Sequence, residues 1–122
     1  IFARTGASVG KTYIYDINDG KVYYAGFLIR ARINSNTNSD FIFQNTLTKK
    51  YYNFVRITSQ RSGQPGINAN EYKDYNISMP QIDEQDSISD FLKTLDDLIV
   101  LHQNKVVNLN SIKSTYLRKM FL

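Results

Sequence analysis

Apolar residues recur every three or four positions along the last third of the chain, from Leu92 to Met120. This heptad spacing is typical of helices that pair with other helices, and neither Gly nor Pro interrupts it. Just upstream, Pro80 forces the residue before it out of helical geometry, and Asp83 offers an N-cap carboxylate. The pattern therefore predicts one helix from Glu84 to Leu122, roughly 50 Å long at 1.5 Å per residue.

Two polar residues, His102 and Lys113, fall on the apolar stripe of this predicted helix. We interpret His102 as a residue that sets the pairing register rather than as a metal ligand, because no second ligand is spaced to join it. No metal or cofactor is predicted anywhere in the chain. The predicted pairing interface consists of Leu92, Leu95, Ile99, His102, Val106, Leu109 and Tyr116.

Charge is distributed unevenly along the predicted helix. Its first half holds six acidic residues and only Lys93, whereas its second half holds four basic residues. The gradient suits the helix dipole, and it also favours an antiparallel partner, because a parallel copy would place acid beside acid. The acidic residues are Asp83, Glu84, Asp86, Asp90, Asp96 and Asp97; the basic residues are Lys105, Lys113, Arg118 and Lys119.

The rest of the chain predicts a small α+β domain. Residues 27–33 alternate between apolar and polar positions, which predicts a strand with Arg30 and Arg32 on its outer face. Residues 13–15 and 21–24 flank the turn Asn18-Asp19-Gly20 and predict a hairpin. Helical spacing over residues 40–55, capped by Ser39 or Asp40, predicts a helix, and residues 75–79 read as a short closing strand.

Two polar loops are the candidate sites. The segment Gly6 to Thr12 resembles a phosphate-binding P-loop, but it has three residues rather than four between its glycines, and β-type residues follow it instead of a helix. Ser8, Lys11 and Thr12 are still suited to a DNA phosphate; the alternative is a tight turn with a solvated lysine. The segment Ser59 to Asn68 combines two glycines and a proline with many donors and acceptors for bases and phosphates.

The composition of the chain also indicates nucleic-acid binding. Residues 1–80 hold ten Lys or Arg against five acidic residues, whereas residues 81–122 hold five against six. A basic front half that is rich in tyrosine and amides is suited to nucleic acid. The chain has no cysteine, signal-peptide pattern or membrane-spanning apolar run, which fits a cytoplasmic protein. It opens without methionine at Ile1, so we expect a fragment.

Several segments, in this order, resemble the specificity subunits of type I restriction-modification systems. The resemblance covers nearly the whole chain, and the combined order is far more specific than any one motif. The segments are Gly6-Ala7-Ser8-Val9-Gly10-Lys11, Ala25-Gly26-Phe27-Leu28-Ile29-Arg30, Ser62-Gly63-Gln64-Pro65-Gly66-Ile67-Asn68, Pro80 with Glu84-Gln85, and Leu117-Arg118-Lys119-Met120-Phe121.

The resemblance implies the end of a target recognition domain followed by a conserved spacer helix. In that family, two recognition domains joined by two antiparallel helices each read half of a split DNA site in the major groove. Separate methylation and restriction subunits, which are the implied partners, perform the chemistry. Eighty residues are few for a whole recognition domain, so its first strands are expected to precede Ile1, and a second copy of the chain could supply the missing helix.

We therefore predict an α+β protein with a small mixed β-sheet, one or two short helices and a single long helix that forms a coiled coil. Residues 1–80 are predicted to be a partial recognition domain, and residues 81–122 the pairing helix. The resemblance implies that base identity comes from the family's variable region, which corresponds here to residues 34–60. The predicted DNA-binding residues are Arg4, Ser8, Lys11, Thr12, Arg30, Arg32, Gln60, Arg61, Ser62 and Gln64.

Two other classes of protein compete with this interpretation. An enzyme would have to use the broken P-loop or the carboxylates Asp96 and Asp97, but adjacent helical residues point about 100° apart and do not share one substrate. The other class is a structural coiled-coil dimeriser without DNA binding. Salt-dependent DNA affinity distinguishes a recognition module from a dimeriser.

Overall fold

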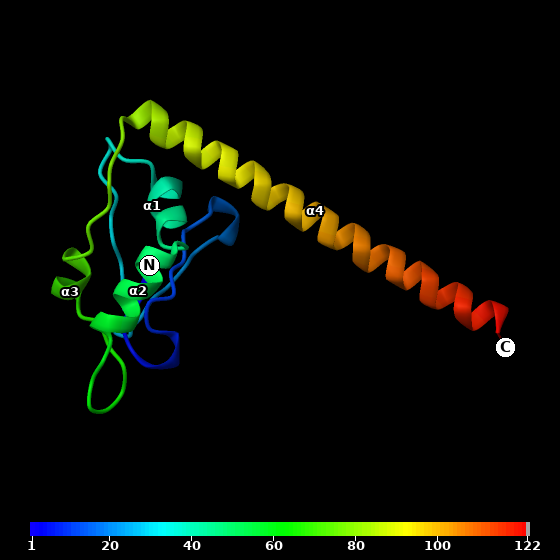
Figure 1. Cartoon of the computed structure of the whole chain (residues 1–122), viewed down its shortest axis with the longest axis horizontal. Helices are drawn as coiled ribbons and strands as arrows, with labels where there is room; N and C mark the ends of the chain where they lie inside the picture. Colours follow the sequence, from blue (N-terminus) through cyan, green and yellow to red (C-terminus); the bar gives the residue numbers. More distant parts are fainter. Residues whose placement is uncertain (122) are drawn as a thin grey trace. The chain divides into compact units, whose positions relative to one another are not determined.

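The computed structural model describes residues 1–121 and divides the chain into two compact units, Ile1–Ser89 and Asp90–Leu122. The elements confirm the predicted α+β class: a small sheet and short helices come first, and one long helix ends the chain (Figure 1). In chain order they are β1 (Phe2–Ala3), η1 (Gly6–Ser8), η2 (Ile17–Asp19), β2 (Leu28–Ile29), α1 (Ser39–Asn45), α2 (Lys49–Thr58), α3 (Ala69–Lys73) and α4 (Ile82–Met120).

The sheet is small because its strands are short. β1 pairs antiparallel with β2, with Phe2 opposite Ile29, and an isolated antiparallel bridge joins Phe2 to Thr12. The strand predicted over residues 27–33 is confirmed only at Leu28–Ile29. Phe27, which falls on the face opposite Arg30 and Arg32 in the predicted alternation, lies just outside the two-residue ladder with β1 and is 72% exposed.

The hairpin predicted for residues 13–24 is wrong. The carboxylate of Asp16 accepts a hydrogen bond from the N–H of Asn18, and that of Asp19 accepts one from the N–H of Asp16, so this capping box closes the short 3₁₀ helix η2. The two extended arms have no ladder of main-chain hydrogen bonds between them. Instead, the Tyr15 hydroxyl donates to the carbonyl of Gly20 and closes the loop.

The helical structure predicted over residues 40–55 is confirmed, but as two helices, α1 and α2, with a short turn between them. Thr46 donates its hydroxyl to the carbonyl of Phe43 at the end of α1, and Thr48 caps α2 by accepting from the N–H of Tyr51. The observed cap of α1 is Asn38 rather than Ser39 or Asp40. Hydroxyl side chains therefore divide a segment whose apolar spacing is continuous.

The second polar loop leads into α3, a helix that the apolar pattern did not predict. Asn68 and Glu71 form a capping box at its start. The closing strand predicted over residues 75–79 is wrong as well. Tyr75 packs its ring against Tyr51 at 5.2 Å and donates its hydroxyl to Asn45, so this segment is held by side chains instead of by a strand ladder.

Aromatic side chains form the core of the first unit. Tyr51 is 4% exposed, and the rings of Phe54 and Tyr75 lie 4.9 Å apart between their centroids. Phe2 from β1 packs against Tyr72 of α3 at 5.2 Å. This cluster ties the sheet, α2 and α3 together, and Ile67, at 1% exposed, is the most deeply buried side chain beside it.

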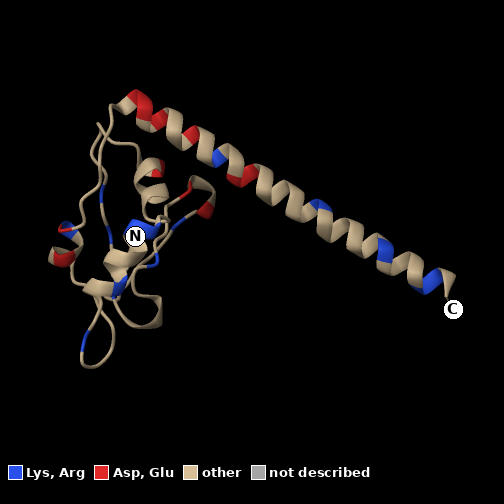
Figure 2. Ribbon diagram, in the orientation of Figure 1, with Lys and Arg blue, Asp and Glu red and all other residues tan. Residues whose placement is uncertain are grey.

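The long helix is confirmed as the unbroken helix α4 (Figure 1), although it begins at Ile82, before the predicted start at Glu84. Its first turns belong to the first unit, where Gln85 accepts from the N–H of Asn38 and donates to the carbonyl of Pro80. Acidic residues lie at its start and basic residues at its end (Figure 2). Its predicted end at Leu122 lies outside the described residues.

Candidate nucleic-acid interface

Main-chain hydrogen bonds join the two polar loops that the sequence singled out. The N–H of Gly6 donates to the carbonyl of Pro65 at 2.9 Å, and the N–H of Ile67 donates to the carbonyl of Arg4 at 2.8 Å. A bridge between Thr5 and Gly66 lies between these two bonds. Residues some sixty positions apart in the sequence therefore form one surface.

Glycine is required at Gly10, where the first loop meets α2. Its backbone has a φ of +82°, and a Cβ atom there would lie 2.4 Å from Cγ1 of Val55. Both the left-handed backbone and the close approach exclude a side chain at this position. The loop consequently lies directly on the helix, and it does so through its main chain.

Two tyrosine hydroxyls anchor the ends of the first loop. The hydroxyl of Tyr51 donates to the buried carbonyl of Gly10 at 2.9 Å, and that of Tyr72 donates to the carbonyl of Ala3 at 2.7 Å. Burial raises the pKa of both phenols above the ordinary value for tyrosine, so both remain protonated donors at neutral pH. The aromatic core thus determines the position of the loop.

Tyr51→Phe is expected to lower the free energy of unfolding by about 1–3 kcal/mol, because the buried carbonyl of Gly10 loses its donor. Urea denaturation measures the effect. The matched control is Tyr52→Phe, since the neighbouring Tyr52 is 66% exposed and should lose little. Equal stability of the two variants would show that the hydroxyl of Tyr51 does not hold the loop.

The second loop is braced by Arg61. Its guanidinium donates to the carbonyls of Thr58 and Gln60 and forms an ion pair with Glu71. Hydrogen bonds from the N–H of Asn68 and then from Arg61 hold the pKa of Glu71 below its ordinary value. Arg61 therefore has structural contacts of its own, and only its remaining N–H groups are open to a ligand.

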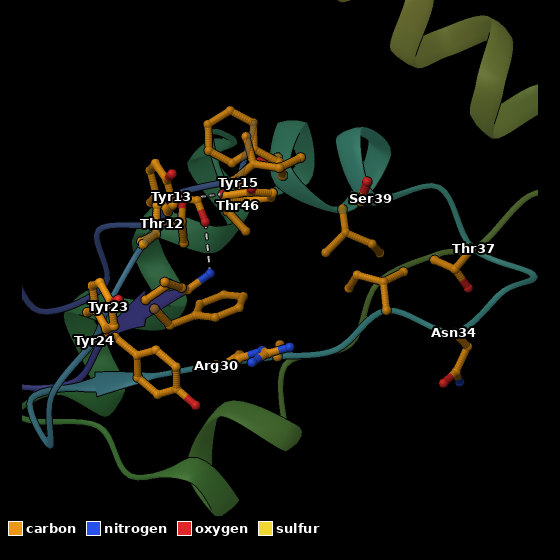
Figure 3. A pocket seen from close by; sticks show the side chains of 18 of the residues that line it. Thr12, Tyr13, Tyr15, Tyr23, Tyr24, Arg30, Asn34, Thr37, Ser39 and Thr46 are labelled. Carbon is orange, nitrogen blue, oxygen red and sulfur yellow. Dashed lines mark hydrogen bonds between the residues drawn. The ribbon is translucent and has the colours of Figure 1, made fainter. Parts of the chain in front are cut away.

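A hollow of about 850 Å³ lies beside the sheet in the same unit (Figure 3). This hollow was not predicted from the sequence, although the density of tyrosine in residues 13–24 could have indicated it. Arg30 and Lys21 supply its cations. The hydroxyl of Tyr13 donates to Asp19 at 2.5 Å, which raises the pKa of Tyr13 to about 12. Its aromatic lining consists of Tyr13, Tyr15, Tyr23, Tyr24, Phe2 and Phe43.

The predicted DNA-binding residues are distributed over this unit in two groups. Thr12 and Arg30 line the hollow, and the hydroxyl of Thr12 shares a hydrogen bond of 2.7 Å with that of Thr46. Arg32 is exposed on the chain that continues from β2. The residues on or beside the two joined loops are Arg4, Ser8, Lys11, Gln60, Arg61, Ser62 and Gln64.

Arg4 differs from the other cations of the joined loops. Its main chain directly follows β1, where its N–H donates to the carbonyl of Phe27 and its carbonyl accepts from the N–H of Ile67. Its Nε atom is buried, and within residues 1–121 no partner accepts from it. The side chain is half-buried as a whole, so its terminal nitrogens remain the part of the group that a phosphate could reach.

The described part of the chain contains no group of three or more side chains that could hold a metal ion. Among its helices, none is long and apolar enough to cross a membrane. The geometry consists of two joined polar loops, a cationic hollow and a long helix with an exposed apolar stripe.

Comparison with known proteins identifies the class of protein to which this geometry belongs. The family model described as type I restriction modification DNA specificity domain matches residues 1–111. No curated protein and no solved structure matches the chain. The chain therefore belongs to the family of type I restriction-modification DNA specificity domains.

Membership defines the role of the chain. It is a specificity subunit, which recognises DNA target sequences and has no catalytic activity, as the sequence analysis predicted. Its partners are DNA and the methylation and restriction subunits of the same system. Family membership does not by itself identify the residues that contact DNA, and it does not establish a pairing of α4.

Proposed function

We propose that the two joined loops, together with Arg30 and Arg32, form the DNA-contacting surface of a recognition domain, residues 1–80, and that residues 81–122 form its pairing helix. The observation that supports this most is the set of main-chain hydrogen bonds uniting the loop of Gly6 with the loop of Pro65. They gather hydroxyl, amide and guanidinium groups on one surface, which is what contact with phosphates and base edges requires.

Within this surface we assign two roles. Arg4, Ser8 and Lys11 would position phosphates, together with the main chain at Thr12, whose hydroxyl is already hydrogen-bonded to Thr46. The second group would contact the groove or the backbone, with base identity coming from residues 34–60. This group consists of Arg30, Arg32, Gln60, Arg61, Ser62 and Gln64.

The experiment is the salt dependence of binding to duplex DNA of mixed sequence. Arg30 and Arg32 are exposed and form no hydrogen bond or ion pair within residues 1–121, so replacing both by alanine leaves the fold intact. Each phosphate contact contributes about 0.9 to the slope of log affinity against log salt, so Arg30→Ala with Arg32→Ala should flatten the slope and weaken binding. Fluorescence anisotropy measures both quantities.

The matched control is Lys73→Ala with Lys93→Ala, which removes the same charge from exposed positions of α3 and α4, outside residues 34–60. It should change affinity much less than the arginine pair does. If the two double variants behave alike, the surface is wrongly assigned, and if the unmodified chain binds DNA without any salt dependence, the phosphate contacts are absent. Arg61→Ala serves as a further variant once its effect on stability is known, because Arg61 also braces its loop.

We further propose that α4 pairs antiparallel with a second copy of the chain. Apolar side chains along its stripe are exposed, among them Ile99 at 53% and Leu109 at 55%. A helix with such a stripe buries it against another helix. Light scattering of the purified chain tests the proposal: a dimer is expected, and a monomer would contradict it.

A further inference from the structure

The apolar stripe of α4 contains two alternating sets of heptad positions. Along the exposed part of the helix, residues of the two sets alternate at intervals of four and three positions. A shallow groove runs over the middle of the helix; its lining residues are Leu95, Leu98, Ile99, His102, Gln103, Val106 and Val107. The first set is Leu92, Ile99, Val106 and Lys113; the second is Ile88, Leu95, His102, Leu109 and Tyr116.

The antiparallel direction of two paired helices restricts which residues of the two sets can lie opposite each other. When two identical helices run antiparallel, side chains of the first set on one helix lie level with side chains of the second set on the other. The helices can therefore pair only in registers that differ by whole heptads, about 10 Å each at 1.5 Å per residue. The charged residues of the two helices then determine which of these registers is the most stable.

We propose, on the basis of the antiparallel pairing above, one specific register, in which Leu95 of each copy packs against Val106 of the second copy. Ile99 then lies opposite the second copy's His102, and Leu92 lies opposite its Leu109. The two-fold axis passes between positions 99 and 102, close to the middle of α4, whose ends are Ile82 and Met120. This register overlaps the two helices over nearly their full length.

The charges of α4 favour this register. It places Lys119 on the same flank of the pair as Glu84 of the second copy and within two positions of it, so the basic end of each helix lies beside the acidic start of the other. Figure 2 shows the acidic start and the basic end of α4. Opposite charges on flanking positions of paired helices stabilise one alignment over others.

A shift by one heptad loses this charge pair. In one direction Lys119 passes beyond the start of the second copy's helix at Ile82, and Glu84 comes to flank Ile112. In the other direction Lys119 comes to flank Phe91, and Lys105 comes to flank Lys105 of the second copy, so like charges meet. The overlap is also shorter in both shifted registers, so less apolar surface is buried.

The absence of cysteine from the sequence allows a direct experiment, because any introduced pair is the only pair present. Leu95→Cys with Val106→Cys should oxidise to a covalent dimer. The two positions lie about 16 Å apart on one helix at 1.5 Å per residue, too far for a bond within one chain. Non-reducing electrophoresis at low protein concentration measures the covalent dimer.

Other cysteine variants separate the possible outcomes. Leu95→Cys alone should remain monomeric on the gel, and a covalent dimer from it would indicate parallel helices and overturn the register. Ile88→Cys with Val106→Cys tests one shifted register, and Leu95→Cys with Lys113→Cys tests the other. Preferential cross-linking of either shifted pair would overturn the register while keeping the antiparallel dimer.

Light scattering of the unmodified chain distinguishes failure of the register from failure of the pairing itself. A dimer in solution together with efficient cross-linking of the Leu95–Val106 pair supports the proposal. A dimer without that cross-link contradicts the register only. A monomer contradicts both the register and the antiparallel pairing on which it rests.

Discussion

Gly10→Ala is expected to lower the free energy of unfolding by about 3 kcal/mol. A backbone φ of +82° costs an alanine about 1–3 kcal/mol, and the new methyl group would lie 2.4 Å from a methyl carbon of Val55. The loop would have to move away from α2 to relieve the overlap. The hydrogen bond from Tyr51 to the carbonyl of Gly10 would then lengthen as well.

The matched control is Gly63→Ala in the second loop. Gly63 has an ordinary φ, and no atom lies within 4 Å of the position of a Cβ atom, so its stability should change little. Chemical denaturation of the two variants measures the difference. Near-equal stabilities would contradict the close packing of the first loop on α2, whereas a loss confined to Gly10→Ala would support it.

Ile99→Asp is expected to weaken dimerisation by roughly a thousandfold. In the proposed register, the substitution buries one carboxylate in each of two symmetry-related central layers. A cost of about 2 kcal/mol for each gives the factor, since every 1.4 kcal/mol is tenfold in Kd. Folding of the first unit should not change, because Ile99 belongs to the second unit and its side chain is 53% exposed in the single chain.

Val100→Asp provides the control for this variant. Val100 is as exposed as Ile99, at 54%, but it lies one position off the stripe. The same new charge there should leave the dimer largely intact. Sedimentation equilibrium of both variants measures the dissociation constants. If the two variants dissociate alike, net charge rather than the stripe controls association.

The long helix α4 could be predicted from the sequence, because a helix of this length repeats the heptad spacing of apolar residues many times. Short elements carry weaker signals. Thr46 and Thr48 divide residues 40–55 into two helices through hydrogen bonds of their hydroxyls, and the apolar spacing contains no trace of that division. Of the strand predicted over residues 27–33, only Leu28–Ile29 forms, because a strand needs a partner and β1 pairs through only two residues.

The candidate site was predicted in part. Polar density identified both loops, but their union depends on main-chain bonds between residues near Gly6 and residues near Pro65, which no local pattern encodes. The structural contacts of Arg61 with Glu71 were equally hidden, since they join a loop to a helix that was not predicted. The hollow beside Arg30 arises from five separate segments of chain.

The anchors of the first loop have a consequence for how the surface of the loop can evolve. Tyr51 and Tyr72 donate to main-chain carbonyls, and the bonds to the second loop also join main chain to main chain. Every residue type carries these carbonyls, so the attachment is indifferent to the side chains on the loop surface. Evolution can therefore replace Ser8, Lys11 or Gln64 at the loop surface while the framework beneath is inherited unaltered.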